Sequence, residues 1–501
     1  MNAIVFILVA FFVLLLLNVP ICVSIGLSCA AYTILYGGLN SSFIAASMFT
    51  SCDSFPLMAV PFFILAGALM EGGGLSKRLV DLGDSLVGHF TGGFAIVTVV
   101  CCAFFGAISG SAPATVAAIG SIMVPTMVER GYDKDFSLGL IAASGCLGIL
   151  IPPSIPMVVY GVSTNTSIGG LFLGGFGPGI LTAILLIIVA IFISRKRGYK
   201  GNGRKFSLKH VGEAFVPAIW AILVPVIILG GIYGGIFTPT EAAAVAVIYG
   251  FFAGKFIYKE LTWKKFVDAV TNSCTTVGSV LIIVGTATTL GRVFTVEKLP
   301  SILSEMIGTI SSEFVILLII NGLLLIVGCL METSAAIMIL APILLPLVVP
   351  FGVNPIHFGL IMVLNLAIGM ITPPVGCNLF VAAGLAKLDF VKIVRAVVPF
   401  LIAMAIGLIL VTYVPQITLA LPQILGYRFR MSADAGAFWL LRLLPSGRYG
   451  APARCGTSLP AKPQSVIMSG NETGPGKGRR RSHGGSEYLQ QGLFGPHSED
   501  A

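Results

Sequence analysis

Long apolar segments constrain this chain more than any other feature of its sequence. A helix needs roughly 20 apolar residues to cross a bilayer, and segments of this kind recur along most of the 501 residues. We expect membrane spans near residues 3–19, 20–37, 55–71, 171–194, 216–234, 236–257, 273–291 and 394–415. Only 10% of the residues are charged, against roughly 25% in soluble domains. The sequence therefore predicts an all-α polytopic membrane protein.

Four further apolar segments are interrupted and do not look like simple spans. Residues 92–127 and 315–348 contain small and polar residues, ISGSAPATVAAIG and LMETSAAIMILAP. Residues 137–165 and 358–386 each contain a double proline near the middle, GILIPPSIP and GMITPPVG. Proline removes a backbone donor and clashes with the preceding helical turn. The first two segments predict helical hairpins that reverse inside the membrane, and the last two predict broken helices.

The interrupted segments recur at one separation, which indicates an internal duplication. Adding 221 to four proline numbers gives four others: Pro125, Pro152, Pro153 and Pro178 correspond to Pro346, Pro373, Pro374 and Pro399. Broken helices at matching places in two repeats are typical of secondary transporters. Unpaired backbone persists in a membrane only where protein or a water-filled site satisfies it. We therefore expect a transporter core built from two related repeats.

The domain organisation follows from these repeats. We expect N-terminal scaffold helices in 1–54, a first repeat in 55–194, a basic loop and central scaffold helices in 195–275, a second repeat in 276–415, a C-terminal end in 416–427 and a disordered tail in 428–501. The loop SRKRGYKGNGRKFSLKH at 194–210 is strongly basic, which predicts that it faces the cytoplasm. The segments 75–90 and 296–314 are amphipathic and too polar to span, so they lie on the membrane surface or brace other helices. No basic patch indicates a nucleic-acid partner.

The tip of the first predicted hairpin carries residues suited to binding ions. Ser109, Gly110 and Ser111 can form a turn, and we expect the Ser111 side chain to cap the returning helix, with Pro113 in its first turn. A helix N-terminus at mid-membrane presents free N–H groups and a positive dipole to an anion. The carbonyl and hydroxyl oxygens of the turn suit a hard monovalent cation. A small-residue packing motif between helices is the alternative interpretation.

The tip of the second predicted hairpin contains an acidic residue in apolar surroundings. Glu332, Thr333 and Ser334 align with the first tip at the same separation, and we expect Thr333 or Ser334 to cap the returning helix. An intramembrane acid marks function by default, as cation attraction, a gate hydrogen bond or proton coupling. The alternative is that Glu332 only satisfies a helix N-terminus.

The two proline breaks are expected to lie opposite the hairpin tips. Residues 148–154 and 369–375 can each expose carbonyl oxygens there, which would create one cation site per repeat with an organic substrate between the tips. Five polar residues lie near the breaks: Ser144, Asn165, Asn365, Thr372 and Asn378. Each is either a ligand or an interhelical hydrogen bond.

Several motifs together resemble one transporter family. FFGAISGSAPATVAAIGSIMVP, GILIPPSIPMVVYG, GGIFTPTEAAA and LNLAIGMITPPVGCNLFVA occur in order. They resemble the large membrane subunit of tripartite ATP-independent periplasmic (TRAP) transporters over roughly residues 1–427. The resemblance implies a sodium-driven elevator transporter with inverted repeats and two re-entrant hairpins in the bacterial inner membrane, without a cofactor and with sodium as the coupling ion. It also implies a small membrane subunit and a periplasmic binding protein as partners, besides membrane lipid and an organic anion substrate.

Site residues are carried over from the family motif by motif. The first sodium site would comprise Ser109, Gly110, Ser111, Gly148 and Pro152, and the second Thr333, Ser334, Gly369 and Thr372. The substrate would contact Ser111, Ala112, Pro113, Ala114, Thr115, Thr333, Ser334, Ala335 and Asn378, with Glu332 as a gate or coupling residue. A C4-dicarboxylate or related carboxylate is the expected substrate.

Two other functions compete with this interpretation. A stand-alone sodium- or proton-coupled symporter or antiporter of related fold would move free substrate without a binding protein. An intramembrane enzyme would need a convergent nucleophile and base or a metal motif, and the sequence contains neither HExxH nor paired intramembrane aspartates. The chain also lacks the GxxxxGK[ST] phosphate cradle, so we do not expect an enzyme.

Overall fold

The computed structural model describes residues 3–426 apart from 18, 38–39, 202, 204–205, 300–301, 303–311 and 387. All regular secondary structure in this part of the chain is helical. Nine of its helices are long and apolar enough to cross a membrane, and a bent pair would make a tenth. The predicted tail at 428–501 and most of the amphipathic segment at 296–314 lie outside the described residues. The prediction of an all-α polytopic membrane protein is confirmed.

The described helices are grouped by the segments predicted from the sequence. The N-terminal segment contains α1 (Ala3–Leu16), α2 (Ile21–Tyr36) and α3 (Ser41–Cys52). The predicted first repeat begins with α4 (Ala59–Gly72) and α5 (Leu75–Val87) and continues with α6 (Gly93–Ser109), α7 (Ala112–Glu129), α8 (Lys134–Gly145), α9 (Leu147–Leu150), α10 (Ile155–Thr164) and α11 (Ile168–Arg197). The central helices are α12 (Leu208–Tyr233), α13 (Pro239–Phe252) and α14 (Trp263–Val296). The predicted second repeat contains α16 (Glu313–Leu330), α17 (Thr333–Val348), α18 (Pro355–Gly369), α19 (Cys377–Ala386) and α20 (Phe390–Tyr413), and the C-terminal end contains α21 (Gln416–Ile424).

Both predicted hairpins and both predicted broken helices are present. Helices α6 and α7 form the first hairpin, and α16 and α17 form the second. The first broken helix runs through α8 and α9 and bends by 42° before α10. The second is interrupted between α18 and α19, where the backbone N–H of Asn378 donates to the Met370 carbonyl at 3.0 Å. The Pro152–Pro153 and Pro373–Pro374 peptide bonds are both cis.

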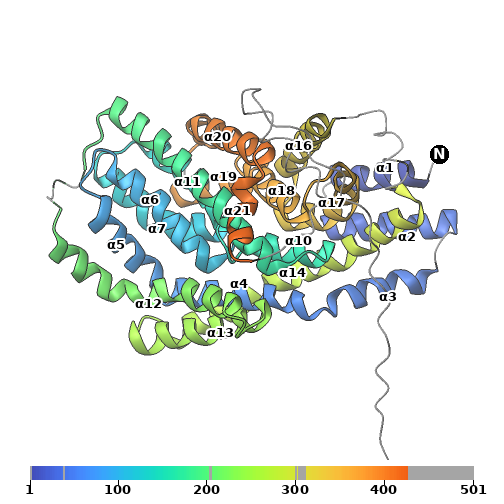
Figure 1. Cartoon of the computed structure of the whole chain (residues 1–501), viewed down its shortest axis with the longest axis horizontal. Helices are drawn as coiled ribbons and strands as arrows, with labels where there is room; N and C mark the ends of the chain where they lie inside the picture. The colour runs from blue at the N-terminus through green and yellow to red at the C-terminus, as the bar shows by residue number, and fades with distance from the viewer. Residues whose placement is uncertain are drawn as a thin grey trace, which may run out of the picture. The chain divides into compact units, whose positions relative to one another are not determined.

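Helices of the two predicted repeats contact each other, and α11 lies beside α20 and α21 (Figure 1). The returning helix of the first hairpin, α7, packs against α19, the second half of the other repeat's broken helix. In the same way α17 packs against α10. Each hairpin also contacts the first half of its own repeat's broken helix, α6 and α7 on α8 and α16 and α17 on α18. The four interrupted elements therefore form one interlocked core.

The remaining helices pack beside this core. Helix α14 contacts α2, α3 and α4, and α4 packs along α13. The amphipathic helix α5 packs against α6 and α12 and buries one apolar face, which includes Leu75, Leu79 and Leu82. Because that face is covered by protein, α5 braces other helices, as one of the two interpretations of segment 75–90 expected.

Candidate functional site

The first hairpin reverses through a tight turn whose geometry differs from the prediction in one respect. Gly110 has a φ of 62° and ends α6, and Pro113 lies in the first turn of α7. Ser111 occupies the N-cap position with extended backbone, but its side chain makes no capping hydrogen bond. The expectation that Ser111 caps α7 is therefore wrong. Among the described residues no group accepts the backbone N–H of Ala112 or Ala114, so the N-terminus of α7 stays open.

Two side-chain hydroxyls and one backbone carbonyl gather at this turn. The Thr115 hydroxyl donates to the Ser111 carbonyl at 2.8 Å, and it lies 3.0 Å from the Ser109 hydroxyl. Ser109 Oγ also lies 3.4 Å from the Ser111 carbonyl oxygen. Ser109 and Thr115 are buried. Neutral oxygens collected in this way are suitable ligands for a hard cation.

The first break packs directly against the first tip. The Gly110 carbonyl accepts from the Ile155 amide at 3.2 Å, so the beginning of α10 is bonded to the turn. A Cβ on Gly148 would lie 2.6 Å from the Ser111 carbonyl oxygen and 2.4 Å from Thr115 Oγ1. Pro152 is buried within the break. The structure thus brings Ser109, Ser111 and Gly148 together, whereas the Gly110 carbonyl is already occupied by a hydrogen bond.

Glu332 determines the geometry of the second tip. It is the N-cap residue of α17, and its carboxylate accepts from the amides of Ser334 at 2.9 Å and Ala335 at 3.1 Å. The Ser334 hydroxyl donates to the same carboxylate at 3.0 Å. The expectation that Thr333 or Ser334 caps this helix is wrong, because the longer acidic side chain reaches both amides. The two tips therefore differ: one helix N-terminus is open and the other is filled by a carboxylate.

The second break contacts its hairpin at a different place. Gly369 lies against the backbone of Gly328 on α16, where a Cβ on Gly369 would come within 2.3 Å of the Gly328 carbonyl carbon. The Thr372 hydroxyl donates to the Ile368 carbonyl at 2.7 Å. In the described part of the chain no hydrogen bond joins Thr333 or Ser334 to this break. Within the break the Thr372 N–H donates to the Gly369 carbonyl at 3.0 Å, so two of the residues expected in the second sodium site are bonded to each other and the two tip residues stand apart from them.

The polar residues near the breaks mostly connect helices. The side-chain amide of Asn378 donates to the Ala142 carbonyl at 3.2 Å and joins α19 to α8. Asn365 donates to Asn321 Oδ1 at 2.7 Å, and Asn321 donates to Thr412 Oγ1 at 3.1 Å, which links α18, α16 and α20. Among the residues near the tips and breaks, four buried oxygens lack a hydrogen-bond partner: Ser144 Oγ, Thr333 Oγ1, Asn365 Oδ1 and Asn378 Oδ1. Asn165 ends α10 with a φ of 53°.

Asn321 was not predicted as part of any polar contact. The available signal was a single amide within the apolar run of α16, where a polar side chain normally has a partner. Its partners on α18 and α20 follow it by 44 and 91 residues. Because these contacts are distant in sequence, the pattern alone could not identify them.

Comparison with known proteins identifies the family. The sequence profile of the tripartite ATP-independent periplasmic transporter, DctM component, matches residues 8–417. This chain belongs to the DctM family. An isethionate TRAP transporter permease protein, DctMQ, of Oleidesulfovibrio alaskensis is 50% identical over 81% of this chain, which spans 64% of that relative. The C4-dicarboxylate TRAP transporter large permease protein of Rhodobacter capsulatus is 41% identical over 82% of this chain and 97% of its own length.

A solved structure supports the fold. The YdaH transporter of Alcanivorax borkumensis matches with a TM-score of 0.56 and 16% identity, over 75% of this chain and 89% of the other. At that identity the likeness shows the fold alone. Membership of the DctM family makes the chain a multi-pass permease of the bacterial inner membrane and not an enzyme.

Proposed function

We propose that this DctM-family chain is the large permease subunit of a sodium-driven transporter that imports an organic anion. The observation that carries the proposal is the first hairpin tip. There the open N-terminus of α7 lies beside the oxygens of Ser109, Ser111 and Thr115, and Gly148 of the break packs against them. An anion seat next to a cluster of neutral oxygens can hold a carboxylate and a sodium ion close together.

The proposed substrate site lies between the two tips. The anionic group would bind at the N-terminus of α7, through the amides of Ala112 and Ala114 and the hydroxyls of Ser111 and Thr115, with Pro113 in the same turn. The opposite wall would comprise Thr333, Ser334, Ala335 and Asn378. Glu332 already fills the N-terminus of α17, so we assign it a gate or coupling role and not a substrate contact.

Two sodium sites would couple transport to the ion gradient. The first would use Ser109, Gly110, Ser111, Gly148 and Pro152, and the second Thr333, Ser334, Gly369 and Thr372. The partnerless oxygen of Thr333 supports the second site. One charge crossing 100 mV gains about 2.3 kcal/mol, so moving more sodium charge than substrate charge would concentrate the anion. The interlocked core would carry the substrate by an elevator motion against the other helices.

The partners and the substrate class are proposed from the relatives. The family description names a tripartite periplasmic transporter, which supports a small membrane subunit and a periplasmic binding protein as the other two parts. Relatives are named for isethionate, C4-dicarboxylate and sialic acid. All three are organic acids, and we propose a C4-dicarboxylate or a related small organic anion for this chain.

Uptake by proteoliposomes tests the proposal. The permease, its small subunit and its binding protein would be reconstituted, and uptake of labelled succinate, isethionate and sialic acid would be measured with an inward sodium or potassium gradient. We expect uptake of one anion with sodium only, and its loss in Ser111→Leu and Thr372→Leu. Ser121→Leu, on an exposed position of α7, is the matched control.

Two outcomes would contradict the proposal. Sodium-driven uptake that persists in both the tip variant and the break variant would refute the proposed ion sites. Uptake of free substrate at the full rate without the binding protein would favour the alternative, a stand-alone symporter.

A further inference from the structure

A basic cavity at one end of the core has no role in the transport site. It has a volume of about 590 Å³ and lies between the start of α8, the end of α11 and the start of α20. Its lining consists of Asp133, Lys134, Asp135, Arg197, Leu388, Lys392 and Arg395. Four of these side chains are basic and two are acidic, so the lining carries a net positive charge.

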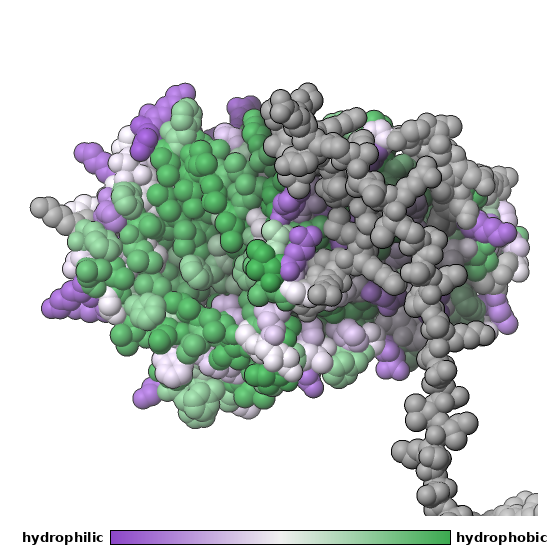
Figure 2. Space-filling view, in the orientation of Figure 1, coloured by the Kyte–Doolittle hydropathy of each residue, from purple (hydrophilic) through white to green (hydrophobic). Residues whose placement is uncertain are grey.

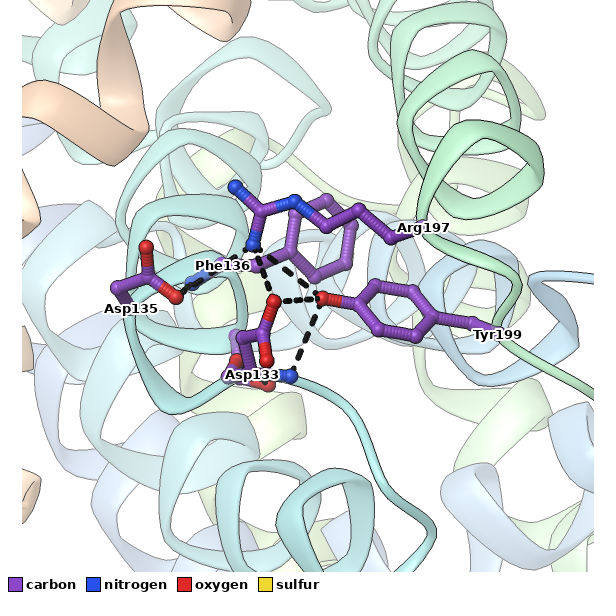
Figure 3. Close-up of polar contacts among 6 residues, drawn as sticks. Asp133, Asp135, Phe136, Arg197 and Tyr199 are labelled. Atoms are coloured by element: carbon purple, nitrogen blue, oxygen red, sulfur yellow. Dashed lines mark hydrogen bonds and ion pairs between the residues drawn. The ribbon is translucent and has the colours of Figure 1, made fainter.

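The two acidic side chains share one cationic neighbour, Arg197 (Figure 3). Arg197 lies 2.6 Å from the Asp133 carboxylate and 3.5 Å from that of Asp135. The Tyr199 hydroxyl donates to Asp133 at 2.7 Å. This bond from Tyr199, together with Arg197, holds the pKa of Asp133 below its usual range. The carboxylates are therefore occupied inside this cluster.

The other three cations of the cavity have no such neighbour. No acidic side chain in the described ranges forms an ion pair with Lys134, Lys392 or Arg395. The first turn of α8 lines the same cavity through Lys134 and Asp135, and the Asp135 carboxylate accepts the Phe136 N–H there at 2.8 Å. Three basic side chains that line one cavity without an acidic partner can together bind an anion from outside the chain.

The position of the cavity defines what kind of anion can reach it. The candidate span of α11 ends at Arg197 and that of α20 begins at Phe390, so the cavity lies at the membrane boundary. On α20, Arg395 shares a helical face with Val398, Ile402, Ile406 and Ile409, at spacings of three and four residues. Those four apolar side chains are between 45% and 57% exposed. A continuous hydrophobic surface also covers the region of α11, with hydrophilic side chains at its edges (Figure 2).

We propose that this cavity binds the headgroup of an anionic phospholipid, with the acyl chains along the exposed apolar face of α20. The phosphate would contact Lys134, Lys392 and Arg395, and the chains would cover Val398, Ile402 and the residues that follow on that face. Basic pockets between membrane helices recognise anionic headgroups in this way. The inference concerns lipid binding and does not depend on the transported substrate.

Lipid titration followed by native mass spectrometry tests the proposal on the purified full-length protein. The ligands are phosphatidylglycerol, phosphatidylcholine with the same acyl chains, and glycerophosphoglycerol, which is the soluble headgroup without chains. We expect the wild type to bind phosphatidylglycerol at least tenfold more tightly than the other two. Removing one surface cation weakens such binding about fivefold, so Lys392→Gln/Arg395→Gln should lose roughly 25-fold.

A charge-matched variant separates a site from general attraction. Lys196→Gln/Lys209→Gln removes two exposed cations near the same end of α11 that do not line the cavity. It should bind phosphatidylglycerol like the wild type. If the α20 double variant elutes as aggregate, Lys134→Gln on α8 should still lose about fivefold. Equal losses in both double variants, or equally tight binding of the soluble headgroup, would overturn the proposal.

Discussion

Replacing Gly148 with alanine should separate the first hairpin tip from the first break. The new Cβ would lie 2.4 Å from Thr115 Oγ1 and 2.6 Å from the Ser111 carbonyl oxygen, whereas ordinary contacts begin at 3.4 Å. The overlap is therefore about 1 Å, and one of the two atoms belongs to the backbone. Overpacking of this kind costs about 1–3 kcal/mol. Movement of the tip by that amount would also disturb the oxygens that we propose for the first sodium site.

The assay for Gly148→Ala combines stability and transport. We expect a lower midpoint of thermal unfolding in detergent. If the whole overpacking cost of about 1–3 kcal/mol weakens sodium binding, the sodium concentration for half-maximal uptake should rise about 5- to 150-fold. The conversion uses a factor of ten in affinity for each 1.4 kcal/mol. The matched control is Gly322→Ala on α16, where an added Cβ meets nothing within 4 Å. Alanine there should be neutral or stabilise the helix by about 0.5–1 kcal/mol. A Gly148→Ala protein with wild-type unfolding and sodium dependence would refute the close contact of tip and break.

Three further predictions concern other polar contacts. Glu332→Ala leaves two amides of α17 without an acceptor and should lower the free energy of unfolding by about 1–2 kcal/mol, measured by thermal unfolding; an unchanged midpoint would contradict the cap. Asn365→Leu removes the bond to Asn321 and should cost about 1 kcal/mol, with Asn365→Gln as the milder control. The bond from Tyr199 keeps the pKa of Asp133 low. The ionised Asp133 carboxylate therefore stabilises the folded protein at neutral pH, and this stabilisation is lost as the pH falls through the lowered pKa. Asp133→Asn should therefore flatten the acid limb of stability against pH, and an unchanged limb would argue against the contact.

The sequence predicted the interrupted elements because proline and glycine act locally. The double prolines at 152–153 and 373–374 cannot continue a helix, and the small residues around Gly110 permit a tight reversal. The same local reasoning places Pro113 in the first turn of α7. These features depend on neighbours within a few residues, which explains why they could be read without coordinates.

The caps and the pairing of the repeats could not be predicted in the same way. Several side chains near each helix N-terminus were able to form the capping hydrogen bond, and which one does so depends on its length and on the surrounding packing. Ser111 makes no capping bond, whereas Glu332 makes one. The contacts of α7 with α19 and of α17 with α10 join residues from different repeats. Hydrophobic periodicity shows that a helix has a buried face but does not identify the helix that covers it.

The interlocked packing of the repeats has a consequence for biosynthesis. When the ribosome has completed the first half, α7 and α10 have left the exit tunnel, but the helices that cover them, α19 and α17, have not been made. Until the second half is made, the faces of α7 and α10 that contact α19 and α17 have no counterpart. A nonsense mutation between the halves would leave a fragment that quality-control proteases can recognise by those uncovered faces.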